Sequence, residues 1–267
     1  MVLFSQMIQA EMTLGTVEII LLTVGFYVII FLVVFALLRK EGEGISSLGF
    51  RVSGLTLIPL AVVFGFVAQL IWILILSVAG GLVFDFGALP AGTFLALVLV
   101  DAVLVAFVEE SAFRGFIQRK LTAGYGFIRS LILTSFLFMI IHIQFYIFLR
   151  LMDPSVMQQA TQLFGITAEQ VWTIMLTGLT QTVIMIFALG LFLGYIYHKS
   201  NQNLVTAAIF HITFNIGGLI VLSYSNAQLV ALSLDYWLFV VLIVIWAAIV
   251  GALVWGTTRA FKKLVRQ

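Results

Sequence analysis

The chain has 267 residues, of which 63% are apolar and 9% are charged, whereas a soluble domain carries about 25% charged residues. This composition excludes a soluble domain, and the absence of ten-residue segments of alternating polarity argues against an outer-membrane barrel. The chain has no cysteine, which excludes disulfides, thiolate metal ligands and a thiol nucleophile.

Seven apolar runs are long enough to cross a bilayer, for which a helix needs about 20 residues. They cover about Thr16–Leu38, Leu55–Leu82, Gly92–Phe113, Phe127–Leu149, Val171–Tyr197, Leu204–Tyr224 and Tyr236–Trp255. We expect the third run to continue as helix towards Lys120, and a break near Gly178 in the fifth would raise the count to eight. The predicted fold is an all-α polytopic transmembrane bundle that forms one domain over residues 1–267.

The basic residues indicate how the bundle crosses the membrane. With seven spans, all but one of the 13 lysines and arginines fall on one side, and the exception is Arg150. Because cytosolic loops are enriched in Lys and Arg, the N-terminus is predicted to lie outside and the C-terminus in the cytosol. The positive charges lie at the ends of spans, so the lipid bilayer is the expected partner and nucleic acid is not.

A polar cluster interrupts the end of the third run. Residues 108–118 read V-E-E-S-A-F-R-G-F-I-Q, and each ionisable group at membrane depth costs roughly 2.5–3.5 kcal/mol on insertion scales. Glu110 and Arg114 are four residues apart, so on a helix they share a face and can neutralise each other. Glu109 points about 100° away and lacks that partner, which makes it the candidate reactive group. Asp101 lies two turns earlier, and its role is left open.

Two later spans add polar side chains at a comparable depth. His142 follows Phe138 by four residues in the fourth run, and His211 and Asn215 are four residues apart in the sixth. Measured from the cytosolic helix ends, Glu109 and these three polar residues lie roughly 12 to 22 Å deep at 1.5 Å per residue. We expect two further amides in the spans, Gln69 and Gln181, to be interhelical hydrogen-bond partners.

This set of side chains suits two kinds of hydrolysis. A carboxylate can take a proton from water, a histidine can hold that water, and N–H groups of histidine and asparagine can donate to a developing oxyanion. Two histidines and a glutamate with an open fourth position are also a known catalytic zinc arrangement, which here would use Glu109, His142 and His211. The spacing leaves both open, and the chain has no H-E-x-x-H motif.

The polar residues form three motifs in a fixed order, Glu109-Glu110-x-x-x-Arg114, Phe138-x-x-x-His142 and His211-x-x-x-Asn215. This series resembles the CPBP family of intramembrane proteases, which includes the type II CAAX prenyl endopeptidases and is also called Rce1-like or Abi. The resemblance covers a core of about residues 92–224. The flanking sequence is similar as well, with Ser47-Leu48-Gly49-Phe50-Arg51 after the first span and Asn203-Leu204 before the third motif.

The resemblance implies an endopeptidase inside the membrane, with a cavity open to the cytosolic side. By that analogy Glu109 is the general base, His142 helps to bind the attacking water, and His211 with Asn215 forms the oxyanion hole. The supporting residues would be Glu110, Arg114 and Phe138.

The resemblance also bears on cofactors and partners. We prefer a mechanism without metal, because the ligand-like residues already have roles as base and donors; zinc is the alternative cofactor. The implied partner is a peptide or protein substrate, either prenylated or membrane-embedded. The expected location is the plasma membrane of a microbe.

Two other classes of function remain as alternatives. A proton-coupled transporter would use Glu109, His142 and Asp101 as a relay, but the sequence shows no two-fold internal repeat of the kind common in transporters. A non-catalytic membrane adaptor or immunity protein would carry a degenerate site, whereas every motif position is intact here. The order of preference is therefore endopeptidase, adaptor, transporter.

Overall fold

The computed structural model describes residues 14–50, 57–80, 82–84, 91–151, 167, 176–224 and 236–265. The predicted all-α class is confirmed by these residues. The main helices are α2 (Leu14–Lys40), α3 (Ile58–Gly80), α7 (Phe127–Leu151), α10 (Phe187–Lys199), α11 (Leu204–Tyr224) and α13 (Tyr236–Val265). The bounds of α2, α3, α7 and α11 follow the predicted apolar runs closely, whereas α13 continues to Val265, beyond the predicted end at Trp255.

Five helical segments in the described residues are long and apolar enough to cross a membrane: Thr23–Lys40, Ile58–Gly80, Leu176–Lys199, Leu204–Val221 and Tyr236–Gly256. The fourth predicted run contributes a shorter apolar helix, Phe127–Ile143. The helix from Leu176 to Lys199 is continuous through Gly178, so the break considered there is absent. The count of seven spans and the orientation of the termini stay predictions.

The third predicted run is a single composite helix that reaches beyond Lys120. Its segments are α4 (Ala91–Leu97), η3 (Val98–Val105), α5 (Ala106–Glu110), η4 (Ser111–Gln118) and α6 (Arg119–Tyr125). The segments η3 and η4 are π-helical, and π-helical turns are rare and frequently lie at functional sites. The two adjacent glutamates therefore lie in a short α-helical stretch between two π-helical ones.

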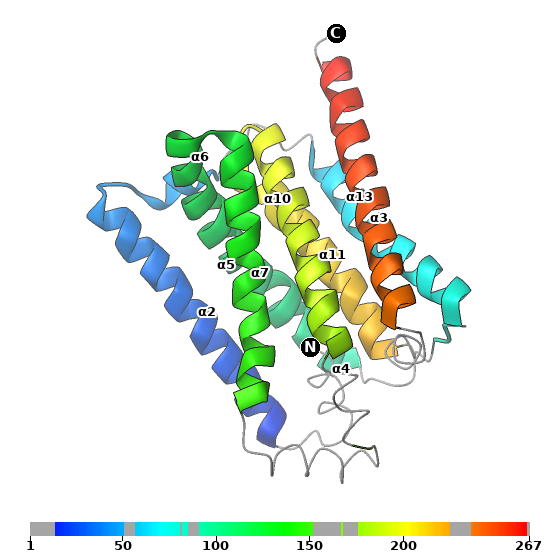
Figure 1. Ribbon diagram of the computed structural model, residues 1–267. Helices are drawn as coiled ribbons and strands as arrows, with labels where there is room; N and C mark the ends of the chain where they lie inside the picture. The colour runs from blue at the N-terminus through cyan, green and yellow to red at the C-terminus, as the bar shows by residue number, and fades with distance from the viewer. Residues whose placement is uncertain are drawn as a thin grey trace.

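The composite helix lies inside the bundle (Figure 1). Its segments α5 and η4 contact α2 and α11, and η4 also contacts α7 and α10. In Figure 1 the end of α2, the whole of α6, the start of α7 and the end of α10 lie at the same end of the bundle. Those segments carry Arg39, Lys40, Arg119, Lys120, Arg129 and Lys199. A single basic end is what the predicted topology requires.

Hydrogen bonds from buried side chains tie α3 to its neighbours. The amide of Gln69 donates to the carbonyl oxygen of Phe214 on α11 at 3.1 Å, which confirms the predicted interhelical role of Gln69. The indole N–H of Trp246 on α13 donates to the carbonyl oxygen of Ala68 at 2.7 Å. Because unpaired polar groups are costly inside a membrane protein, these bonds help to fix the register of α3.

Close packing between α3 and α11 depends on Gly65. An added Cβ there would lie 1.9 Å from Oγ1 of Thr213 and 2.8 Å from the carbonyl oxygen of Phe210. We expect Gly65→Ala to lower the free energy of unfolding by about 1–3 kcal/mol, because overpacking forces side chains and backbone apart. Thermal unfolding in detergent measures this effect.

Gly25→Ala is the matched control for that variant. Gly25 lies in α2, and an added Cβ there would meet nothing within 4 Å. Since alanine favours a helix over glycine by roughly 1 kcal/mol, this control should keep or raise the unfolding midpoint. Equal midpoints for the two variants would contradict the close contact between α3 and α11.

The segment after α2 docks on the start of α11. The short 3₁₀ helix η1 (Ile45–Leu48) is capped at its C-terminal end by Gly49, whose φ of +97° lies in the left-handed region that favours glycine. The carbonyl oxygen of Gly49 accepts a hydrogen bond from the backbone N–H of Leu204 at 2.9 Å. Asn203 caps α11 by accepting from the N–H of Val205 at 2.9 Å. The flanking sequences thus fix the helix that carries His211.

Ion pairs link the same segment to α6. Glu43 binds Arg119 and Lys120, and Lys120 also binds Glu41. Hydrogen bonds from Arg119 and Lys120 lower the pKa of Glu43 from 4.5 to about 2. Hydrogen bonds to Glu41 and Glu43 raise the pKa of Lys120. These contacts join the end of α2 to the end of the composite helix.

The lowered pKa of Glu43 sets a pH window for these contacts. A carboxyl with a depressed folded-state pKa contributes its full stability above pH 4.5 and loses it as the pH falls from 4.5 towards about 2. Carbon-13 NMR of the carboxyl groups, with Glu43→Gln to assign the signal, should show Glu43 still ionised at pH 4.5. A midpoint near 4.5 would mean that the pairs with Arg119 and Lys120 do not form.

Candidate active site

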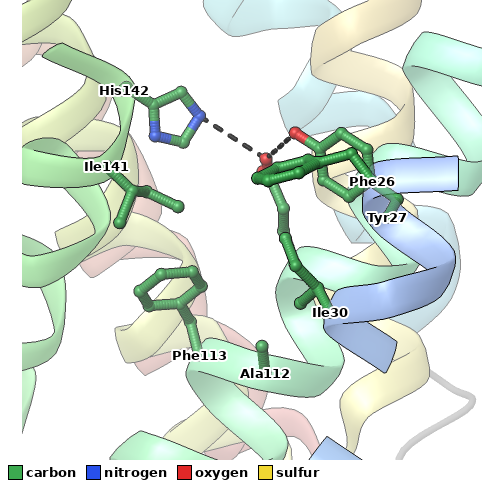
Figure 2. A pocket seen from close by; sticks show the side chains of 8 residues that line it. Phe26, Tyr27, Ile30, Ala112, Phe113, Ile141 and His142 are labelled. Atoms are coloured by element: carbon green, nitrogen blue, oxygen red, sulfur yellow. Dashed lines mark hydrogen bonds and ion pairs between the residues drawn. The ribbon is translucent and has the colours of Figure 1, made fainter. Parts of the chain in front are cut away.

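The carboxylate of Glu109 is the centre of the candidate site, and only 3% of this residue is exposed. Its Oε1 accepts a hydrogen bond from the hydroxyl of Tyr27 at 2.7 Å and lies 3.6 Å from Nε2 of His142. Its Oε2 lies 3.9 Å from Nε2 of His211. Figure 2 shows Tyr27 and His142 reaching the same carboxylate oxygen from α2 and α7. The structure therefore brings Glu109 and both motif histidines together.

The second glutamate is fully buried and has two partners. Its Oε1 accepts from Nη1 of Arg114 at 2.9 Å, as the spacing predicts, and lies 2.9 Å from Nδ1 of His211. Arg114 also donates to the carbonyl oxygen of Gly190 at 3.2 Å, and its guanidinium lies 4.4 Å from the centre of the Phe138 ring. Glu110 thus orients His211 in addition to pairing with Arg114.

Phe138 lies between these groups and is fully buried. Its ring centre lies 4.6 Å from that of His142 and 5.9 Å from that of His211. The Nδ1 atom of His142 lies 2.6 Å from the carbonyl oxygen of Phe138. A carbonyl oxygen can only accept, so Nδ1 carries the proton and Nε2 is the atom that faces Glu109.

A pocket of about 60 Å³ adjoins the carboxylate, which is room for a small number of water molecules. The 3.6 Å between Glu109 and His142 exceeds a direct hydrogen bond, so a water molecule beside them can contact both groups. The pocket is lined by Phe26, Tyr27, Ile30, Glu109, Ala112, Phe113, Ile141 and His142.

Of the remaining candidate residues, the structure places Asn215 on α11 and Asp101 on η3. Asn215 follows His211 by four residues on α11 and is partly buried. The residues that line the pocket include neither Asn215 nor His211. Asp101 lies in η3, two turns before Glu109, and its side chain is outside the part of the chain that the structure describes.

The zinc alternative finds no support in the part of the chain that the structure describes. The Nε2 atoms of His142 and His211 lie 3.6 and 3.9 Å from the two oxygens of Glu109. Among the described residues, no group of three His, Cys, Asp or Glu side chains is arranged to hold a metal ion. The mechanism below therefore has no step that runs through a metal.

Two features of the site were not predicted from the sequence. Tyr27 lies in the first apolar run, where nothing in its neighbourhood separates it from an ordinary span aromatic. The contact between Glu110 and His211 joins residues 101 positions apart. The matching depth of the two residues is the sequence signal that could have indicated it.

Residues 91–217 match the model of one family, type II CAAX prenyl endopeptidase Rce1-like. The comparisons with curated proteins and with solved structures give no match. The Rce1-like segment includes all three motifs, whereas α2 with Tyr27 lies outside it. Residues 91–217 are thus similar to a CAAX-type intramembrane endopeptidase family, and the apolar helices point to an integral membrane protein.

Proposed function

We propose that the protein is an intramembrane endopeptidase in which Glu109 activates water to attack a peptide bond. The observation that carries this proposal is the convergence of two histidine Nε2 atoms on one buried carboxylate, at 3.6 and 3.9 Å, beside a pocket large enough for water. The three residues, Glu109, His142 and His211, lie within the Rce1-like segment, which supports the same chemistry.

The attacking water is held between Glu109 and His142. In the neutral ring of His142 whose Nδ1 donates to the carbonyl oxygen of Phe138, Nε2 is free to accept a hydrogen bond from that water. As the water oxygen bonds to the peptide carbonyl carbon, one proton passes to the carboxylate of Glu109. Glu109 then gives this proton to the leaving amine as the C–N bond breaks, and the carboxylate is regenerated.

His211 and Asn215 stabilise the oxyanion. Nδ1 of His211 donates to Glu110, so Nε2 can donate to the oxyanion when His211 carries both protons. Glu110 contacts both His211 and Arg114, and in that state the two carboxylates of the site, Glu109 and Glu110, balance the charges of His211 and Arg114. The Asn215 amide, four residues further along α11, is the second donor.

We propose that the peptide reaches the site from the cytosolic side of a microbial plasma membrane. The composite helix continues from Glu109 into α6, which lies at the basic end of the bundle. The chain has no native cysteine to interfere with labelling. A cysteine introduced at Tyr125, the end of α6, should react with a membrane-impermeant reagent from the cytosolic side. Reaction from the outer side alone would reverse the orientation.

A quenched fluorescent peptide tests the proposed function. We expect purified protein to cleave a peptide with an isoprenylated cysteine near its C-terminus, and comparison with the unprenylated peptide shows whether the lipid is recognised. A chelator should leave the rate unchanged. Loss of activity with the chelator and recovery with zinc would overturn the metal-free mechanism, and a protein that cleaves neither peptide would favour the adaptor alternative.

A further inference from the structure

Tyr27 belongs to a narrow face of α2 that points into the bundle. Val34 and Leu38, which follow Tyr27 at helical spacing, are buried in the core. The ring of Phe31, one turn after Tyr27, lies 6.3 Å from the ring of Phe107. Phe107 precedes Glu109 by two residues, so this face of α2 is docked against the helix that carries the proposed base.

This docking brings the hydroxyl of Tyr27 to Oε1 of Glu109 at 2.7 Å, across 82 positions of sequence. A hydrogen bond to a carboxylate is stronger than one between neutral groups. Residues outside the Rce1-like segment therefore contact the centre of the candidate site.

We propose that Tyr27 is a positioning residue for Glu109, a role that rests on the proposed peptidase function. The terminal torsion of a glutamate is broad, so the carboxylate plane is not fixed by its rotamer alone. The hydroxyl fixes it, and the two oxygens then have different roles. Oε1 faces His142 and the pocket, whereas Oε2 faces His211.

This position of the carboxylate matters for the attack on the substrate. The proton of the bound water must pass to Glu109 while the water oxygen approaches the peptide carbonyl, and such transfers need heavy atoms within hydrogen-bond reach. A carboxylate free to rotate spends less time in that geometry. The hydroxyl of Tyr27 takes no part in bond making or breaking, so its removal should reduce the rate of the chemical step and leave substrate binding intact.

Tyr27→Phe removes the hydroxyl and keeps the ring. We expect kcat to fall about 10-fold or more, as the loss of one hydrogen bond to a charged group implies, with KM and the unfolding midpoint unchanged. Tyr125→Phe is the matched control, because Tyr125 lies on α6 and is 59% exposed. A purely structural role would instead lower the unfolding midpoint or raise KM, and either result without a fall in kcat would overturn the proposal.

An infrared measurement tests the contact without relying on activity. The difference between the spectra of wild type and Glu109→Gln isolates the carboxylate band of Glu109, and Tyr27→Phe should shift that band while Tyr125→Phe leaves it in place. An unshifted band overturns the positioning role. If wild type cleaves the peptide and Tyr27→Phe has the same kcat, the positioning role is also overturned, while the proposed function stands. A shifted band in a protein that cleaves no peptide overturns the proposed function and retains the contact.

Discussion

Glu109→Gln should reduce peptide cleavage by about 1,000-fold or more and leave the bundle folded. Removal of a general base typically costs 100- to 10,000-fold, and glutamine keeps the size of the side chain while losing the ability to take a proton. Its amide oxygen can still accept the hydrogen bond that Tyr27 gives to Glu109. We therefore expect kcat to fall while the unfolding midpoint and the binding of peptide stay close to those of wild type.

The control for this variant is Glu41→Gln. Glu41 is a carboxylate at the basic end of the bundle, where it pairs with Lys120 and its side chain is 43% exposed. Its replacement should leave cleavage unchanged. A Glu109→Gln protein that still cleaves at the wild-type rate would show that another residue is the base.

Arg114→Ala should lower the free energy of unfolding by about 3–5 kcal/mol, which is typical when one partner of a buried ion pair is removed. Both side chains of the pair are fully buried, so the variant leaves the charge of Glu110 inside the bundle. It also removes the hydrogen bond to the carbonyl oxygen of Gly190 and the contact with the Phe138 ring. Thermal unfolding in detergent should therefore show an early transition, with a low yield of folded protein.

Two comparisons separate the buried charge from the loss of a side chain. The double variant Glu110→Gln with Arg114→Met removes both charges, so it should lose less stability than Arg114→Ala alone. Lys120→Ala breaks the partly exposed pairs with Glu41 and Glu43 and should cost less than Arg114→Ala, since a surface pair is worth about 0–1 kcal/mol. Arg114→Ala with a normal midpoint and no cleavage would instead place Arg114 in the chemistry.

Hydropathy was enough to predict the helices. The sixth apolar run, predicted as Leu204–Tyr224, has the same bounds as α11, and the fourth differs from α7 by two residues at its end. Long apolar runs give a strong signal because the bilayer demands about 20 residues per span. The pair of Glu110 and Arg114 was predictable for a similar reason, since four-residue spacing on a helix dictates a shared face.

The details of the site depend on how helices rotate and cross, which the apolar pattern does not encode. The contacts of Tyr27 with Glu109 and of Glu110 with His211 arise only after α2 and α11 have docked on the composite helix. For the same reason the sequence did not indicate that α2, rather than α11, would line the pocket beside Glu109. The π-helical turns around α5 had no sequence signal, because they depend on local packing.

A single-turnover reaction in H₂¹⁸O tests the central claim most directly. If Glu109 acts as a base on water, mass spectrometry should find one ¹⁸O atom in the new C-terminal carboxylate of the peptide and no label in Glu109. Glu109→Gln protein should return intact peptide under the same conditions. Unlabelled product with ¹⁸O in the carboxyl of Glu109 would make Glu109 a nucleophile, and intact peptide with wild type would contradict the peptidase account altogether.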